Sequence, residues 1–223
     1  MDSTEQDVRI VVDAVELDGI LSVPHGAAGI VLFAHGSGSS RLSPRNTYVA
    51  GELRRAGIAT LLFDLLTLRE AADRAMVFDV ELLATRLGAT RGWVGHYATT
   101  QNLAIGYFGA STGAAAALIA AAGDPTIQAV VSRGGRPDMA AAVLPKVTAP
   151  TLLIVGGDDT PVIRLNEQAY ALLHCEKALR IVPGASHLFE EPGTLEEVTR
   201  LATEWFGRHL VRRPATAPRV VAR

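Results

Sequence analysis

The chain has 223 residues, of which 48% are hydrophobic, 20% are charged and 5% are aromatic, and its formal net charge is −2. This length is ample for a domain with a buried core, and the near balance of charge predicts no nucleic-acid partner. The single cysteine, Cys175, excludes an intrachain disulfide and a zinc site built from several cysteines.

The N-terminal segment, MDSTEQDVRI, is acidic and polar, and it lacks the basic start and apolar stretch of a signal peptide. No uninterrupted apolar run approaches the roughly 18 residues that a membrane-spanning helix needs. We therefore expect a soluble, cytoplasmic protein that binds no membrane.

The first part of the chain predicts a hairpin, a buried strand and a helix. Residues 8–12 and 19–23 are rich in apolar side chains and predict two strands, joined by a turn at Asp18 and Gly19. Residues 30–34 are apolar throughout and end at several glycines, which is typical of a parallel strand covered on both faces. Ser43 and Pro44 provide the cap and the first turn of a helix over residues 45–56.

Strands and helices alternate from there to residue 210. The predicted strands are residues 58–63, 103–108, 129–132, 151–155 and 178–182, and the predicted helices are residues 78–97, 112–122, 138–144, 162–173 and 195–210. This alternation predicts βαβ units in a single α/β domain over residues 1–210. Its sheet is mostly parallel and doubly wound, with the N-terminal hairpin as an antiparallel edge.

The composition changes after Leu210. Five arginines and no acidic residue lie in residues 208–223. We interpret residues 211–223 as a basic, flexible and solvated tail, since chain ends are often mobile. Binding of an acidic partner by this tail is the alternative.

A candidate nucleophile follows the strand at residues 103–108. Gly109, Ala110, Ser111, Thr112 and Gly113 form a G-x-S-x-G sequence directly before an alanine-rich helix. In a strand-to-helix turn of this kind the small glycines allow close approach of strand and helix, and the serine hydroxyl is exposed above the sheet. The alternative is a glycine-rich turn whose serine only caps the helix.

Two later strand ends supply the partners that a serine nucleophile needs. A serine hydroxyl is a poor nucleophile until a base takes its proton and a third group orients that base. Asp158 and Asp159 follow the strand at 151–155, and His187 follows the strand at 178–182. The chain order of serine, aspartate and histidine is that of the α/β-hydrolase arrangement.

The segment after residues 30–34 predicts the second donor of an oxyanion hole. It reads His35-Gly36-Ser37-Gly38, and its small residues let the Ser37 N–H face a carbonyl oxygen opposite the Thr112 N–H. A phosphate cradle is the weaker alternative, because the loop lacks the third glycine of a dinucleotide fingerprint and no P-loop lysine is present.

Six segments together resemble the dienelactone-hydrolase-like branch of the α/β-hydrolases: HGSGSSRLSPRN, FDLLT, GYFGASTGAAAAL, SRGGRPD, TLLIVGGDD and VPGASHLFEEPG. The resemblance extends from about residue 20 to residue 210. It implies the α/β-hydrolase fold, with Ser111 as nucleophile, His187 as base and an aspartate after the penultimate strand. True dienelactone hydrolases use cysteine where this chain has Ser111. Some relatives are fused to a phosphoribosyltransferase-like domain, for which these residues have no counterpart.

The usual spacing in this family, G-x-x-D counted from Gly156, selects Asp159 as the third member of the triad, and Val162 fits the D-x-x-V continuation. Asp158 is then a turn residue that accepts local N–H groups. Asp158 as the triad acid stays the alternative.

We therefore expect a serine hydrolase that cleaves a small-molecule carboxylic ester, lactone or thioester through an acyl-enzyme. An acyltransferase with the same triad and a non-catalytic ligand-binding protein are the alternatives. We expect no cofactor and no metal, because the chain has no H-E-x-x-H pair and its other histidines are scattered, at His25, His96, His174 and His209.

The substrate prediction depends on one short connection and four arginines. About 18 residues separate Ser132 from Thr151, where a lid is usually inserted, so we expect an open pocket without a cap domain. Surface-loop arginines usually have structural roles, so we favour the interpretation that these side chains pair with Asp138, Glu70 or other acids and hold loops in place. Arginines also bind carboxylates well, so an anionic substrate is the alternative. The four arginines are Arg41, Arg45, Arg133 and Arg136.

Overall fold

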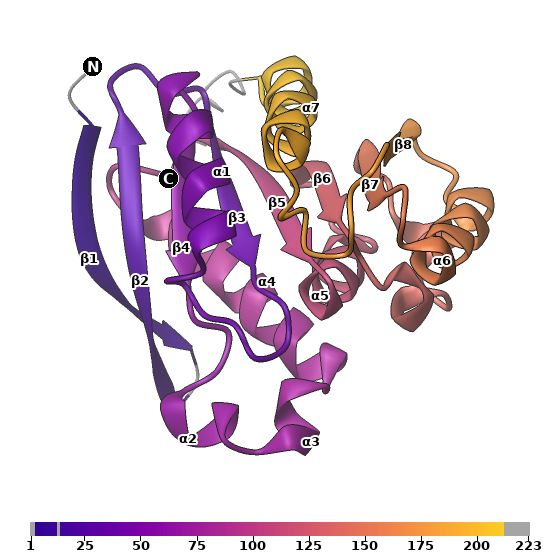
Figure 1. Ribbon diagram of the computed structural model, residues 1–223. Helices are drawn as coiled ribbons and strands as arrows, with labels where there is room; N and C mark the ends of the chain where they lie inside the picture. The colour runs from indigo at the N-terminus through magenta and orange to yellow at the C-terminus, as the bar shows by residue number, and fades with distance from the viewer. Residues whose placement is uncertain (1–2, 13, 212–223) are drawn as a thin grey trace, which may run out of the picture.

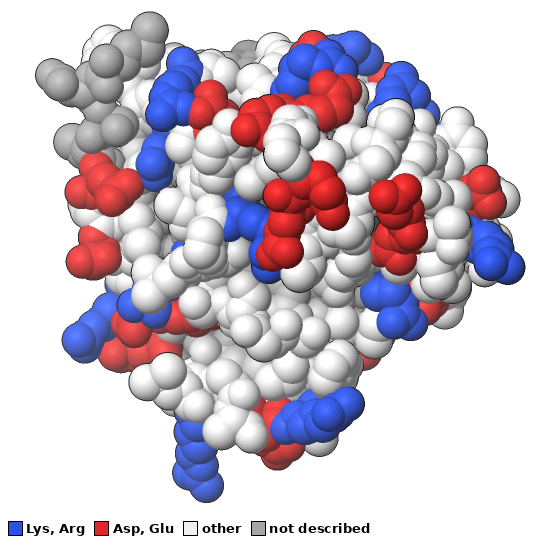
Figure 2. Space-filling model, in the orientation of Figure 1, with Lys and Arg blue, Asp and Glu red and all other residues white. Residues whose placement is uncertain are grey.

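The structure is a computed structural model that describes residues 3–12 and 14–211. Apart from Val211, the predicted basic tail over residues 211–223 lies outside the described residues. Acidic and basic side chains are mixed over the face shown in Figure 2. Among the described residues, no helix has the length and apolar character required to cross a membrane.

Eight strands form one sheet in the order β1-β2-β4-β3-β5-β6-β7-β8. β1 pairs with β2 and β2 with β4 in antiparallel fashion, and every other neighbouring pair is parallel. The predicted mostly parallel sheet with an antiparallel N-terminal edge is therefore confirmed. The strands are β1 (Ser3–Val12), β2 (Val15–Pro24), β3 (Gly29–Ala34), β4 (Ala59–Phe63), β5 (Ala104–Ala110), β6 (Ile127–Arg133), β7 (Thr151–Gly156) and β8 (Lys177–Val182).

Helices cover both faces of the sheet (Figure 1). α1 and α7 pack on one face, and α4, α5 and α6 pack on the other. All residues of β3, β4, β5 and β7 are consequently buried, which explains their continuous apolar sequences. The helices are α1 (Pro44–Arg55), α2 (Leu68–Ala71), α3 (Arg74–Val77), α4 (Val80–His96), α5 (Thr112–Ala121), α6 (Thr160–Leu172) and α7 (Thr194–His209).

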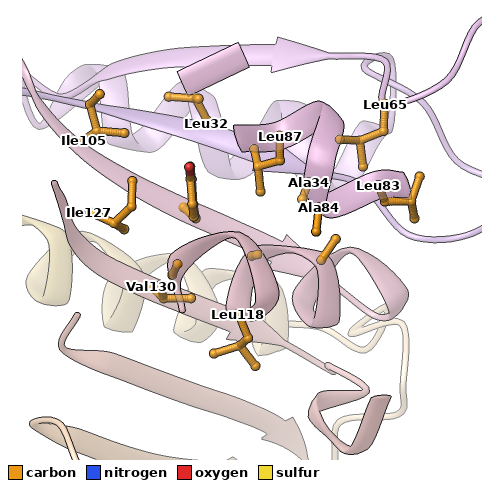
Figure 3. Close-up of a cluster of buried hydrophobic side chains, with 14 of the residues drawn as sticks. Leu32, Ala34, Leu65, Leu83, Ala84, Leu87, Ile105, Leu118, Ile127 and Val130 are labelled. Atoms are coloured by element: carbon orange, nitrogen blue, oxygen red, sulfur yellow. The ribbon is translucent and has the colours of Figure 1, made fainter. Parts of the chain in front are cut away.

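The core between α4, α5 and the sheet is shown in Figure 3. Leu83 and Leu87 of α4 and Leu118 of α5 belong to the same buried cluster as Leu32 of β3 and Val130 of β6. Gly88 and Gly92 do not interrupt α4, because the packing of this apolar side offsets the low helix propensity of glycine.

The predicted turn at Asp18 and Gly19 is wrong. β2 passes straight through both residues, and the chain reverses between Val12 and Val15. The pair Asp-Gly is a turn signal, but buried side chains continue at alternate positions on both sides of it, at Leu17 and Leu21. Burial of this face keeps the segment in an extended strand. Gly19 has a packing role there, because a Cβ at this position would lie 3.1 Å from Val8.

The predicted helix near residues 138–144 is also wrong. Two short 3-10 helices replace it, η1 (Pro137–Ala140) and η2 (Leu144–Lys146). The segment is short, and Pro145 cannot continue an α-helix because it has no N–H to donate. The structure describes every residue between β6 and β7, and these two turns are the only helical structure there, so the connection contains no cap domain.

Candidate active site

Ser111 occupies the turn between β5 and α5. Its φ of 51° lies in the left-handed region that non-glycine residues rarely adopt. Two backbone hydrogen bonds hold it there, from the Ser111 N–H to the Arg133 carbonyl oxygen at 3.2 Å and from the Arg136 N–H to the Ser111 carbonyl oxygen at 3.1 Å. The turn also needs glycine at position 113, where a Cβ would lie 2.1 Å from the carbonyl oxygen of Ala34. A strained serine directly before a helix is the geometry of a nucleophile elbow.

His187 and Asp159 are in direct contact. His187 Nδ1 lies 2.6 Å from Asp159 Oδ2, and the side chains are 39% and 13% exposed. Because an ionised carboxylate only accepts hydrogen bonds, the imidazole carries its proton on Nδ1 and leaves Nε2 free to accept one. Asp158 is exposed, and its backbone N–H donates to the carbonyl oxygen of Ala185. Of the two candidate aspartates, Asp159 is thus the one that contacts His187.

The loop that carries His187 is held from several sides. Phe189 is buried and has a φ of 55°, so a second strained residue lies two positions after the histidine. The Ser186 N–H donates to Glu191 Oε2 at 3.0 Å, and hydrogen bonds from Ser186 hold the pKa of that carboxyl below its ordinary value. Gly156 makes room for the loop, since a Cβ there would lie 2.3 Å from the Ala185 carbonyl oxygen.

The two residues that carry the predicted oxyanion donors, Ser37 and Thr112, are joined by a hydrogen bond. Thr112 begins α5, and its N–H is one of the first-turn groups that have no partner within a helix. The Ser37 N–H donates to the Thr112 hydroxyl oxygen at 2.9 Å. A substrate oxyanion at this position would therefore replace that hydroxyl as the acceptor of the Ser37 N–H.

His35 anchors the loop that contains Ser37, a role that the sequence interpretation missed. Its Nε2 accepts the Leu65 N–H at 3.1 Å, so its proton is on Nδ1, which lies 3.1 Å from the Gly36 carbonyl oxygen. Burial lowers the pKa of His35, against the opposing effects of the Gly36 carbonyl and Asp64. The sequence carries one signal for this role: His35 comes directly after an apolar strand and directly before Gly36.

Ser111 and His187 line one pocket of about 230 Å³. Ser37, Arg45, Asn46 and Arg133 line it as well. A smaller and mostly apolar pocket shares the loop of Ser37 with it, and its apolar lining comes from Leu66, Leu68, Ala71, Val77 and Leu83. Among the described residues, no three His, Cys, Asp or Glu side chains gather closely enough to hold a metal ion.

The four arginines have different surroundings, and three of them are paired. Arg41 forms an ion pair with Asp64, and Arg136 binds both carboxylate oxygens of Asp138 at 2.8 Å. Neither lines the pocket of Ser111. Arg45 lines that pocket and pairs with Glu190 at 3.0 Å.

Arg133 differs from the three paired arginines. It is only 7% exposed, and no carboxylate partner lies within ion-pair distance among the described residues. Its guanidinium lies over the ring of Phe189, 5.8 Å from the centroid. Burial, with the nearby charge of Arg45, lowers the pKa of Arg133 to about 10, so the side chain is still cationic at neutral pH.

Comparison with known proteins finds matches over most of the chain. A profile described as the dienelactone hydrolase family matches residues 28–210. A Mycobacterium tuberculosis protein named as a phosphoribosyl transferase is 58% identical over 208 residues, or 92% of this chain. Those residues are 47% of that protein, so the chain spans about half the length of this relative.

Two solved structures are similar to this chain over most of its length. A dienelactone hydrolase from Anabaena variabilis is 58% identical with a TM-score of 0.92, over 93% of this chain and 99% of that one. Est1E from Butyrivibrio proteoclasticus is 16% identical with a TM-score of 0.74, over 91% and 98% of the two chains. The second likeness concerns the fold alone.

Proposed function

The chain belongs to the dienelactone hydrolase family and is a hydrolase of the α/β-hydrolase type, and on this basis we propose that it cleaves small carboxylic esters, lactones or thioesters by serine catalysis. The observation that supports this most strongly is the 2.6 Å contact between His187 and Asp159 at a pocket that Ser111 also lines. A nucleophile, a base and an orienting carboxylate are the parts that acyl transfer requires.

The first half of the proposed reaction forms an acyl-enzyme. Ser111 Oγ attacks the substrate carbonyl carbon while His187 Nε2 takes the hydroxyl proton. The carbonyl oxygen becomes an oxyanion, which accepts hydrogen bonds from the N–H groups of Thr112 and Ser37. Collapse of this intermediate breaks the bond to the alcohol or thiol, which leaves with the proton from His187.

The second half regenerates the enzyme. Water attacks the acyl carbon, and His187 takes one of its protons and returns it to Ser111 Oγ as the carboxylic acid is released. Asp159 stays ionised throughout, keeps the imidazole in the required tautomer and stabilises the imidazolium. The pocket of about 230 Å³ and the absence of a cap between β6 and β7 favour a small ester over a long lipid.

Phosphoribosyl transfer is not proposed for this chain. The residues that match the longer Mycobacterium tuberculosis protein largely coincide with the segment that matches the dienelactone hydrolase profile. The name of that protein therefore does not describe the chemistry that the matched residues support.

Labelling with a fluorophosphonate probe tests the proposal. We expect one label per chain in the wild type and in Ser132→Ala, and a loss of both labelling and short aryl ester hydrolysis in Ser111→Ala. Ser132→Ala is the matched control, because Ser132 is a buried serine at the end of the neighbouring strand. Equal labelling of Ser111→Ala and the wild type, or no labelling of folded wild type, would refute serine catalysis.

A further inference from the structure

Asn166 is a buried polar residue in the second turn of α6, the helix whose N-cap residue is Asp159. Asparagine is a poor helix former, and a buried amide is costly unless it forms hydrogen bonds. The reaction steps proposed above do not use this residue. The presence of an amide at a fully buried position of a helix therefore needs another explanation.

The side chain of Asn166 donates two hydrogen bonds to backbone carbonyl groups. Its Nδ2 lies 2.9 Å from the Val162 carbonyl oxygen, one turn earlier in α6, and 3.1 Å from the Gly135 carbonyl oxygen in the loop after β6. Two carbonyl acceptors fix the orientation of the amide, because Oδ1 in their place would repel them. Oδ1 is buried and has no hydrogen-bond partner among the described residues, so the amide contributes through its donors.

The Gly135 carbonyl belongs to the same peptide group as the Arg136 N–H. That N–H donates to the Ser111 carbonyl oxygen at 3.1 Å, which also accepts the Ala114 N–H. The Ser111 carbonyl shares its peptide group with the Thr112 N–H, the proposed oxyanion donor. None of the described peptide bonds is cis, so the C=O and N–H of each group point in opposite directions. One chain of hydrogen bonds therefore runs from α6 to the position of the oxyanion.

The dipoles of this chain are aligned. Both peptide groups direct their carbonyl ends toward Asn166 and their N–H ends toward the oxyanion position. Hydrogen bonds in series polarise one another, by about 10–30% per bond, and dipoles that are fixed in advance stabilise the charge that develops in a transition state. Donation by Asn166 therefore strengthens the Thr112 N–H as a donor.

The first peptide group of the chain needs an anchor, because it follows two glycines. Glycine changes its backbone angles at little cost. A Cβ at Gly134 would lie 3.1 Å from the His187 carbonyl oxygen. A Cβ at Gly135 would lie 2.0 Å from Ser132 Oγ, so the packing leaves little room for a larger residue at either position. Without the amide from α6, rotation of this peptide group would turn its N–H away from Ser111.

We propose that Asn166 is a positioning residue of the oxyanion hole. It fixes the peptide group between residues 135 and 136, and through that group it orients and polarises the Thr112 N–H. The proposal rests on the serine hydrolase function proposed above. Asn166 does not touch the substrate, because it is fully buried and does not line the pocket of Ser111. Its effect is therefore on the transition state, where the oxyanion forms, and not on binding of the ester.

The alternative role for Asn166 is structural. Its hydrogen bonds could do no more than hold α6 against the loop after β6. A structural role would lower the Tm and leave kcat of the folded protein unchanged. A positioning role lowers kcat and leaves KM unchanged.

Asn166→Leu removes both donors and keeps a side chain of similar size. We expect kcat on a short aryl ester to fall by about ten-fold, the size expected for one hydrogen bond, with KM within about two-fold of the wild type. Inhibition by a trifluoromethyl ketone should weaken by the same factor, because its adduct with Ser111 carries an oxyanion.

Thr100→Val is the matched control. Thr100 is also buried and donates to the Val94 carbonyl oxygen at 2.7 Å, but it lies near the opposite end of β5 from Ser111. The control should lower the Tm and keep kcat and the inhibition constant of the wild type.

Asn166→Asp gives a second readout that packing alone would not move. The introduced carboxyl group can donate to the Gly135 carbonyl only while it is protonated, and in its ionised form it repels that carbonyl. Burial raises the pKa of such a carboxyl group. The ratio of kcat in Asn166→Asp to kcat in the wild type should therefore be closest to unity at about pH 5. It should fall by about ten-fold or more by about pH 9, over the range in which circular dichroism shows both proteins folded.

The outcomes separate this proposal from the function on which it rests. Asn166→Leu that keeps the kcat of the wild type, or a loss that Thr100→Val shares, overturns the positioning role. A ratio of kcat in Asn166→Asp that does not change with pH overturns it as well, and this ratio decides the question if Asn166→Leu does not fold. Wild type that is not labelled by fluorophosphonate instead overturns the proposed function.

Discussion

Replacing Asp159 by asparagine tests the orientation of the proposed base. The substitution keeps the shape of the side chain and removes the charge that lies 2.6 Å from His187 Nδ1. Loss of a hydrogen bond between charged groups accounts for about 1.5–3 kcal/mol, or roughly ten- to hundred-fold in rate. The amide can also donate to Nδ1 and so move the proton to Nε2, where it blocks transfer from Ser111. Together these effects predict a loss of kcat approaching ten-thousand-fold, or about 5 kcal/mol.

The assay is kcat on a short aryl ester, together with the rate of fluorophosphonate labelling. Asp158→Asn is the matched control, because that carboxylate is exposed and its backbone hydrogen bond to Ala185 does not depend on the side chain. We expect Asp158→Asn to stay within about two-fold of the wild type. The Tm should change by only a few degrees in either variant, since the charge of Asp159 at the start of α6 contributes on the order of 1–2 kcal/mol to stability. A larger loss in Asp158→Asn than in Asp159→Asn would refute the assignment.

Three further predictions concern the surroundings of the site. Gly113→Ala should lower the free energy of unfolding in urea by about 1–3 kcal/mol, because the added Cβ would clash with the Ala34 carbonyl oxygen. Gly88→Ala should raise it slightly, because there is open space around Gly88 in α4 and alanine has the higher helix propensity. Thr112→Val should keep kcat within about ten-fold of the wild type, because it removes the hydroxyl that occupies the Ser37 N–H. Removal of an oxyanion donor costs about a hundred-fold or more, so a loss of that size would show that the Thr112 hydroxyl itself donates to the oxyanion. The free energy of unfolding should fall as the pH drops below about 6.5, because burial lowers the pKa of His35 in the folded protein and the unfolded chain therefore takes up a proton on this histidine first. His35→Gln should reduce this pH dependence, and an equal dependence in both proteins would contradict the prediction.

Local pattern was enough to predict the layers of the fold. Continuous apolar runs such as residues 30–34 predicted strands buried on both faces, and the structure confirms them because helices pack on both sides of the sheet. The G-x-S-x-G sequence between β5 and α5 also predicted a tight turn, and Ser111 has the left-handed backbone that such a turn requires. These features depend on neighbours in the sequence, so the sequence carries them directly.

Local signals failed where a distant contact decided the outcome. Asp18 and Gly19 have the composition of a turn, but pairing of β2 with β1 and β4 keeps them in a strand. Residues 138–144 have helical composition, but a short connection that contains Pro145 forms only 3-10 turns.

The sequence by itself determined the strand ends that carry Ser111, Asp159 and His187, because each follows an apolar run that the sheet must bury. Only the tertiary structure decided which groups meet at those ends. It brought Asp159 rather than Asp158 to His187, paired Arg41 and Arg136 with acids, and left Arg133 buried without a carboxylate. The physical reason is that the carboxyl ends of parallel strands converge at one edge of the sheet. Which side chains pair there depends on the geometry of loops far apart in the chain, and no local pattern encodes it.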